Sequence, residues 1–135
     1  MIPNATLPHR VLVIDDEPGM RSLMRRGLTL AGYAVETVDG GEAGLEAANR
    51  EPADLVLLDL MMPGLDGFET LERLCAIRPA PKVIVLSGRD EPEDRQRAAG
   101  ANMFLVKPIA FDQLLESIQA AIAAPITAPI TPSLG

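Results

Sequence analysis

Residues 53–59 read Ala53-Asp-Leu-Val-Leu-Leu-Asp59, an aliphatic run that ends on an acid. Strands that are apolar at nearly every position are buried on both faces, which is typical of a parallel sheet covered by helices. Similar runs occur at 11–14, 83–86 and 103–106, and a weaker, alternating run occurs at 34–38. The sequence therefore predicts five strands, of which the four continuous ones are buried on both faces.

Helix-like segments separate these strands. Apolar residues recur at helical spacing in 20–31, 41–50, 68–75 and 111–122. The segment 88–100 is densely charged, and Ala98 and Ala99 are its only clearly apolar residues, so we expect a short, weakly packed helix there. Strands that alternate with helices predict one α/β domain, with a doubly wound five-stranded parallel sheet and five helices.

Length and composition limit the function classes. The 135 residues fit one domain, and we expect an N-terminal arm at 1–8, the domain at 9–124 and a Pro-rich tail or linker at 125–135. A net charge of −7 disfavours direct binding to nucleic acid or to anionic lipid. The single cysteine excludes an internal disulfide, and no apolar run is long enough to span a membrane. These features favour a cytoplasmic protein.

Polar side chains follow four of the predicted strands. The first strand runs into Asp15-Asp16-Glu17, the third ends at Asp59, the fourth at Ser87 and the fifth at Lys107-Pro108. The carboxyl ends of parallel strands meet at one edge of a sheet, where doubly wound domains bind their ligands. We therefore expect these side chains to converge.

The acids at this edge suit a divalent metal ion. Close carboxylates repel one another, and a hard cation such as Mg²⁺ relieves the repulsion through oxygen ligands. Asp16 and Asp59 are the predicted direct ligands, and Asp15 is expected to act through water. The alternative is that Asp15, Asp16 and Glu17 only favour the positive end of the following helix, and for Glu17 this interpretation is preferred.

Asp59, Lys107 and Ser87 suit phosphoryl chemistry. A carboxylate such as Asp59 can attack a phosphoryl group and form an acyl phosphate, although a lone Asp after a strand is often a turn former. Lys107 follows four apolar residues and should seek an anion, either Asp59 or phosphate, unless it extends into solvent. Ser87 can donate one hydrogen bond, unless it is only a turn serine. The Lys107–Pro108 peptide can be cis.

Taken together, the chain resembles the receiver domain of bacterial two-component response regulators. The resemblance covers about residues 9–124 and rests on motifs in family order: Asp15-Asp16, Asp59…Met62-Pro63-Gly64…Asp66-Gly67, Ser87-Gly88, Gly100-Ala101 and Lys107-Pro108. It implies the strand order 2-1-3-4-5. It also implies that Asp59 is the phosphoacceptor, that Asp16, Asp59 and the Met61 backbone carbonyl bind Mg²⁺ with the help of Asp15, and that Ser87 and Lys107 hold the phosphoryl oxygens.

The resemblance also implies partners and a switch. The phosphoryl donor would be a phosphohistidine on a sensor histidine kinase or a histidine phosphotransfer protein. Phosphate would draw Ser87 inward, and Phe104, otherwise an ordinary core aromatic, would rotate into the vacated space. The surface of the fourth helix, fifth strand and fifth helix would then change, and this surface can control a downstream protein or output domain, or form a homodimer.

Two other functions compete with this interpretation. A magnesium-dependent phosphatase also uses an Asp nucleophile, but it places a second acid two residues later to move a proton. Here that position is Met61, so we expect a persisting acyl phosphate and no enzymatic turnover of substrates. The third hypothesis is a receiver-like interaction module that is never phosphorylated. The presence of all five pocket residues argues against it: Asp15, Asp16, Asp59, Ser87 and Lys107.

Overall fold

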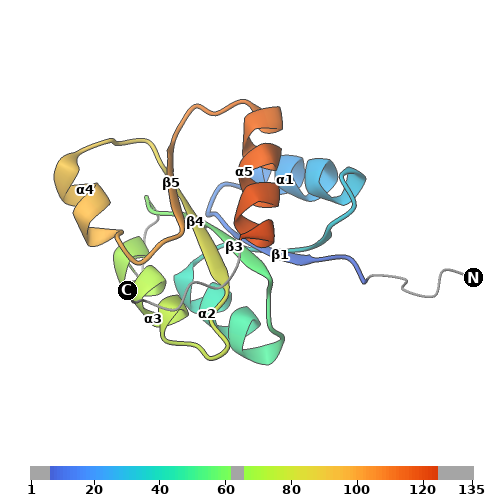
Figure 1. The fold of residues 1–135 in the computed structure, drawn as a ribbon, viewed down its shortest axis with the longest axis horizontal. Helices are drawn as coiled ribbons and strands as arrows, with labels where there is room; N and C mark the ends of the chain where they lie inside the picture. The colour runs from blue at the N-terminus through green and yellow to red at the C-terminus, as the bar shows by residue number, and fades with distance from the viewer. Residues whose placement is uncertain (1–6, 62–65, 125–135) are drawn as a thin grey trace, which may run out of the picture.

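The computed structural model describes residues 7–61 and 66–124. Figure 1 shows a central sheet with helices on both sides. The strands are β1 (Arg10–Ile14), β2 (Ala34–Val38), β3 (Leu55–Asp59), β4 (Lys82–Ser87) and β5 (Met103–Val106). The helices are α1 (Pro18–Leu30), α2 (Gly41–Arg50), α3 (Gly67–Cys75), α4 (Pro92–Arg97) and α5 (Phe111–Ala123). None of these helices has the length and hydropathy needed to cross a bilayer.

All neighbouring strands are parallel, in the order β2-β1-β3-β4-β5. β1 lies between β2 and β3, so the strand order reverses there and creates the switch point at which doubly wound domains bind ligands. The predicted fold, with its five strands, five helices and strand order, is confirmed. Residues 62–65 and the predicted tail lie outside the described residues, and the domain boundaries stay predictions.

The core lies in two layers, one on each face of the sheet. Leu12 and Ile14 of β1 pack in the cluster that contains buried residues of α2 and α3. Val11 and Val13 pack in the other cluster, with buried residues of α1 and α5. Successive residues of a strand point to opposite faces, so a strand covered on both sides must be apolar at every position. This arrangement explains the continuous aliphatic runs.

The edge strand β5 departs from the sequence prediction. The run 103–106 was expected to be buried on both faces, like the other continuous runs, but every residue of β5 is only half-buried. β3, at the centre of the sheet, is buried throughout. The difference arises because β5 pairs only with β4 and forms one edge of the sheet.

Helix α4 is the short element expected in 88–100. It has six residues, and Ala98 at its C-terminal end is buried whereas Ala99 is exposed. The carboxylate-bearing residue Asp94 is also buried, with 7% of its surface exposed. Hydrophobic patterning did not predict this, because a charged side chain is buried only where a partner is available.

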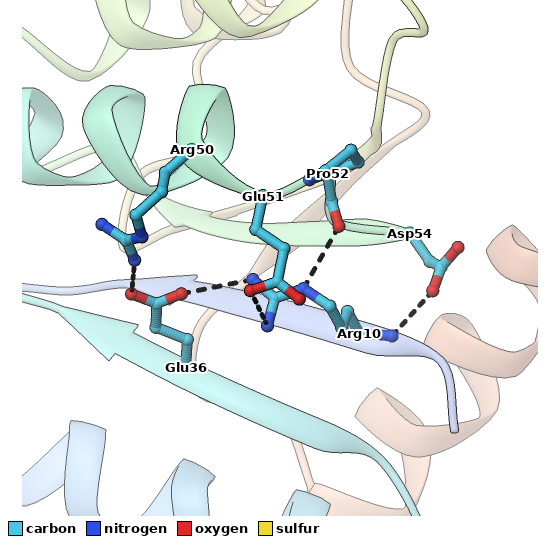
Figure 2. Close-up of polar contacts among 6 residues, drawn as sticks. All are labelled: Arg10, Glu36, Arg50, Glu51, Pro52 and Asp54. Atoms are coloured by element: carbon cyan, nitrogen blue, oxygen red, sulfur yellow. Dashed lines mark hydrogen bonds and ion pairs between the residues drawn. The ribbon is translucent and has the colours of Figure 1, made fainter. Parts of the chain in front are cut away.

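A group of paired charges lies at the amino end of the sheet, and we call it the amino-end cluster: Arg10, Glu36, Arg50, Glu51 and Asp54. Arg10 is its centre (Figure 2). Its backbone N–H donates to Asp54 (2.7 Å), and its guanidinium donates to Glu36 (3.2 Å) and to the Pro52 carbonyl (3.1 Å). Arg50 donates to the other oxygen of Glu36, and Glu51 lies 3.5 Å from Arg10. These contacts tie β1, β2 and the approach to β3 together.

Candidate functional site

Four strands deliver polar residues to the carboxyl edge of the sheet. Asp15 follows β1, Asp59 and Ser87 end β3 and β4, and Lys107 follows β5. The parallel register brings the strand ends level, because Asp59 pairs with Leu86 and Ser87 pairs with Val106. The predicted convergence is therefore present in the structure.

The carboxylates of Asp15, Asp16 and Asp59 form an acidic cluster. One oxygen from each lies within 4.8 Å of the others. Asp15 and Asp59 are buried, with 3% and 5% of their surfaces exposed, whereas Asp16 is exposed. Two of the three carboxylates are thus enclosed by the protein, and the third lies on the solvent side of the group.

Asp15 occupies an unfavourable position for a charge. Burial raises the pKa of its carboxyl above the ordinary value, and the neighbouring Asp59 and Asp16 raise it further. The Glu17 N–H, which donates to Asp15 Oδ1 (2.9 Å), and the Lys107 ammonium lower the pKa but do not offset the burial. Arg21 from α1 donates to the Asp15 backbone carbonyl (2.8 Å), which fixes the turn without neutralising the carboxylate.

Asp59 is held by one backbone group and one cation. Its Oδ1 accepts a hydrogen bond from the Met61 N–H (3.0 Å), and its Oδ2 lies 3.4 Å from Lys107 Nζ. The Lys107 side chain is 32% exposed, and it pairs with Asp59 as the sequence predicted. Lys107 is followed by a cis peptide bond to Pro108, which was also anticipated.

Ser87 is buried at the end of β4, with 1% of its surface exposed. Its hydroxyl donates to the Arg89 carbonyl (2.9 Å) and accepts from the Arg89 N–H (3.0 Å). The Ser87 carbonyl accepts from the Lys107 N–H (2.8 Å), which links the ends of β4 and β5. The hydroxyl is therefore at the correct edge of the sheet but is engaged by the following loop.

The donor set of the acidic cluster fits a hard divalent cation. Three carboxylates meet one ammonium, so their charges are incompletely offset within the protein. Oxygen ligands of this kind suit Mg²⁺, which commonly binds to one or two carboxylates and keeps several waters. The predicted ligand role of the Met61 carbonyl is untested, and Glu17 lies outside the cluster, which agrees with its preferred role at the start of α1.

Met62-Pro63-Gly64 and Asp66-Gly67 are the two motif segments that follow Asp59 in the sequence. Met62, Pro63 and Gly64 lie outside the described residues. Gly67, the first residue of α3, approaches the backbone of Leu60 so closely that an added Cβ would lie 2.5 Å from the Leu60 carbonyl oxygen. A backbone atom cannot move aside as a flexible side chain can, so Gly67 lets α3 start directly against the segment that follows Asp59.

Phe104 is the predicted switch aromatic, and its ring is half-buried on β5. The Arg95 guanidinium of α4 lies 4.7 Å from the ring centroid, within the range of a cation–π contact. Arg89, which contacts Ser87, and Arg95 were not among the predicted site residues. For Arg95 the only signal in the sequence was a dense charge run, whereas Arg89 could be noted from its place two residues after Ser87.

An apolar groove of about 500 Å³ adjoins the acidic cluster. Asp15 and Lys107 line it at one end, and α1 and the start of α5 line its sides with apolar groups. Its apolar lining residues are Met20, Leu23, Met24, Leu86, Pro108, Ile109, Phe111 and Leu114. Leu23 is 57% exposed, so this face presents hydrophobic surface directly beside the candidate site.

Comparison with known proteins places this geometry in context. The model of the response regulator receiver domain family matches residues 11–119. The chain is 42% identical over 114 residues to the transcriptional regulatory protein KdpE of Mycobacterium tuberculosis, covering 83% of this chain and 50% of that protein. It is 38% identical over 113 residues to HprR of Escherichia coli, covering 82% and 50%. The chain spans about half the length of these curated relatives.

Solved structures show the same architecture. The response regulator TrrA of Thermotoga maritima, in complex with Mg²⁺ and BeF, has a TM-score of 0.77 and is 32% identical, covering 84% of this chain and 98% of that one. TrrA in complex with the histidine kinase ThkA matches with a TM-score of 0.77 and 31% identity, covering 86% and 99%.

Proposed function

The chain belongs to the response regulator receiver domain family of two-component phosphorelay signalling, and we propose that Asp59 is the residue that accepts the phosphoryl group. The observation that carries the proposal is the setting of Asp59. Its carboxylate is buried at the switch point of the sheet, 3.4 Å from Lys107 and within the acidic cluster. A solvent-exposed turn former would need neither the burial nor the cation.

In the proposed reaction, an Asp59 carboxylate oxygen attacks the phosphorus of a phosphohistidine. A P–O bond forms, the P–N bond breaks and the imidazole leaves, so Asp59 becomes an acyl phosphate. Lys107 turns from Asp59 to a phosphoryl oxygen, which it suits as a point charge, and Ser87 donates a hydrogen bond to another. Asp15, Asp16, Asp59 and the Met61 carbonyl would hold Mg²⁺, which offsets the charge of phosphoryl oxygens when bound.

The output of the phosphorylated state is proposed to follow from Ser87 and Phe104. Once the Ser87 hydroxyl turns toward the phosphoryl group, Phe104 can move inward from its half-buried position under Arg95. The surface of α4, β5 and α5 then changes, which would control a downstream protein or an output domain, or assemble a homodimer. Phe104 has no hydroxyl, so its two positions differ in packing and in the contact with Arg95.

The phosphoryl donor is proposed to be a histidine kinase or a histidine phosphotransfer protein that docks in the apolar groove beside Asp15 and Lys107. A donor histidine must reach the buried Asp59. Asp15 and Lys107, which lie beside Asp59 in the site, also line the groove, next to the hydrophobic surface around Leu23. TrrA, a similar structure, is known in complex with a histidine kinase. Kinases draw their phosphate from intracellular ATP, so the proposed location is the bacterial cytoplasm.

A phosphorylation assay tests the assignment of Asp59. The protein is incubated with Mg²⁺ and acetyl phosphate, and intact mass is measured. We expect one base-labile phosphate, lost in Asp59→Asn and kept in Asp39→Asn, a matched change at an exposed acid after β2. Labelling that persists in Asp59→Asn would refute the site.

The same assay separates a signalling switch from a phosphatase. Met61 is 53% exposed and its thioether cannot transfer a proton, so each phosphoryl group should stay on Asp59 and not be passed to water in rapid turnover. Steady-state hydrolysis of p-nitrophenyl phosphate that depends on Asp59 would instead establish an enzyme.

A pair of leucines tests the donor surface. Leu23 lines the groove, whereas Leu30, on the same helix and 82% exposed, does not. With an autophosphorylated kinase that labels the wild-type chain, Leu23→Glu should slow phosphotransfer at least tenfold, and Leu30→Glu should leave it unchanged. Both variants should accept phosphate from acetyl phosphate at the wild-type rate. Equal effects of the two substitutions on kinase transfer would remove the groove as the docking site.

A further inference from the structure

The Ser87 hydroxyl has a partner that competes with a phosphoryl group. A hydroxyl has a single hydrogen to donate, and in this structure the Arg89 carbonyl accepts it (2.9 Å). The Arg89 N–H also donates a hydrogen bond to the Ser87 hydroxyl oxygen (3.0 Å). Ser87 can therefore donate to a phosphoryl oxygen on Asp59 only if it gives up the Arg89 carbonyl, which costs the loop between β4 and α4 one of its contacts with the sheet.

The side chain of the same residue, Arg89, is bound to α4. Its Nε lies 3.1 Å from Asp94 Oδ2, and a terminal nitrogen lies 3.2 Å from Asp94 Oδ1, which makes a two-pronged contact. The Asp94 side chain is 10% exposed, whereas that of Arg89 is 56% exposed. The carboxylate is thus the buried member of the pair. Losing the partner would cost the buried carboxylate more free energy than it would cost the exposed guanidinium.

Asp94 is also the buried residue of α4. The other five residues of this helix are exposed, and Ala98 at its C-cap adds the only further buried group in the described segment 88–100. The other ion pairs of α4 are made by its exposed arginines, Arg95 with Asp90 and Arg97 with Asp66, so Asp94 is the one buried side chain of the helix. The Arg89–Asp94 pair is therefore well placed to decide where the β4–α4 loop sits.

We propose that the Arg89–Asp94 pair is a latch that stabilises the resting conformation by keeping the Arg89 carbonyl on the Ser87 hydroxyl. The inference rests on the proposed phosphorylation of Asp59. Whatever free energy the latch adds to the resting state must be overcome when a phosphoryl group recruits Ser87. Removing the latch therefore shifts the equilibrium toward the phosphate-binding conformation and tightens binding of a phosphoryl analogue.

The molecule offers a matched control within the same segment. Asp90 pairs with Arg95, so it is also an aspartate–arginine pair at α4, but both side chains are 50% exposed and neither contacts Ser87. Replacing Asp90 removes the same charge from the same surface without touching the latch. A general electrostatic effect would act through both positions, whereas the latch acts only through Asp94.

The test measures the affinity of the protein for beryllofluoride in saturating Mg²⁺ by calorimetry. We expect Asp94→Asn to bind about fivefold more tightly than wild type, the lower end of typical couplings between two sites. Arg89→Gln, which changes the exposed partner and spares the buried helix residue, should act in the same direction. Asp90→Asn should match wild type. Amide spectra establish that each variant is folded.

The Ser87→Ala background makes the test specific. Without the hydroxyl there is nothing for the latch to withhold, so adding Asp94→Asn or Arg89→Gln should no longer change the affinity. Equal affinities of wild type and both latch variants, an equal gain in Asp90→Asn, or a gain that persists in Ser87→Ala would each overturn the latch. A wild-type protein that binds no beryllofluoride would overturn the proposed function itself, and the latch with it.

Discussion

The two ends of the sheet both gather carboxylates but offset them differently. At the amino end, Glu36, Glu51 and Asp54 meet Arg10 and Arg50 (Figure 2). At the carboxyl end, the three acids of the acidic cluster meet Lys107, their only ion-pair partner among the described residues. The first group sets two guanidinium groups against three carboxylates, whereas the second sets one ammonium group against three.

The titration behaviour of the two ends differs accordingly. Burial alone would raise the pKa of Glu36, but its hydrogen bonds and ion pairs with Arg10 and Arg50 bring the pKa below the ordinary value. Burial raises the pKa of Asp15, and its neighbours do not reverse the change. The same chemical group is stabilised as an anion at one end of the sheet and destabilised as an anion at the other.

This difference separates a structural role from a functional one. Charges that are fully paired within the protein have nothing left to offer a ligand. Charges that are incompletely paired make the protein less stable by themselves but attract a cation and a phosphoryl group that complete them.

Breaking the amino-end cluster at its centre should have the largest effect. Arg10→Ala removes one of the two arginine donors of Glu36 and the donor of the Pro52 carbonyl, and should lower the free energy of unfolding by about 3 kcal/mol. Arg50→Ala, at a side chain that is 56% exposed, should cost no more than about 1 kcal/mol. Urea denaturation of both variants checks the ranking, and equal losses would contradict the central role of Arg10.

Completing the acidic cluster should stabilise the protein. If Mg²⁺ binds only the folded state, a Mg²⁺ concentration about a hundred times the dissociation constant adds about 2.7 kcal/mol to the free energy of unfolding. Thermal unfolding with and without Mg²⁺ should therefore show a rise in Tm, and Asp16→Asn should abolish most of it. Glu36→Gln, which removes an acid at the other end, should keep the rise. An equal rise in all variants would indicate that the ion binds elsewhere.

The same change from acid to amide should have opposite signs at the two ends. In metal-free protein, Asp15→Asn removes a disfavoured charge and keeps an acceptor for the Glu17 N–H, so it should raise the free energy of unfolding by about 1 kcal/mol. Glu36→Gln should lower it by about 1 kcal/mol, because two arginines lose a charged partner. Chemical denaturation in EDTA measures both, and a shared sign would contradict the comparison.

The stability differences of Asp15→Asn and Glu36→Gln from wild type have opposite signs, but both should disappear as the pH falls. The raised pKa of Asp15 means that the folded state binds the proton more tightly than the unfolded state, so its destabilising effect disappears as the pH falls. The lowered pKa of Glu36 gives stability above the ordinary glutamate pKa, which is lost as the pH falls through the folded value. Asp15→Asn should therefore converge on wild type as the pH falls to the ordinary aspartate pKa of about 3.9, and Glu36→Gln as it falls below the ordinary glutamate pKa of about 4.3.

Much of the fold and site could be read from local patterns. The continuous runs at 11–14, 55–58 and 83–86 predicted a sheet covered on both faces, because a strand buried on both sides must be apolar at every residue. The acids, hydroxyl and amine at the strand ends were expected to converge, and they do, because parallel strands end at one edge. The pairing of Lys107 with Asp59 followed from the same reasoning.

Other features could not be predicted because they depend on which segments meet. The run 103–106 resembles the central strands, but its exposure depends on its place at the edge of the sheet. Asp94 stands in a charge run, and nothing in the run marks it as the acid that is buried and paired with Arg89. In the same way, Arg10 begins a strand as any surface arginine could, and its central role depends on partners 26 to 44 residues away.

The sequence by itself determined the order of the elements, the two-faced burial of the central strands and the kinds of side chain at the carboxyl edge. These properties follow from short-range periodicity and from the geometry of parallel strands. Apart from the predicted Lys107–Asp59 pair, only the tertiary structure decided which charges are paired. The residue type alone does not distinguish a carboxylate of the amino-end cluster from one of the acidic cluster. The number of cations that the fold brings to each cluster gives the first a structural role and leaves the second available to a ligand.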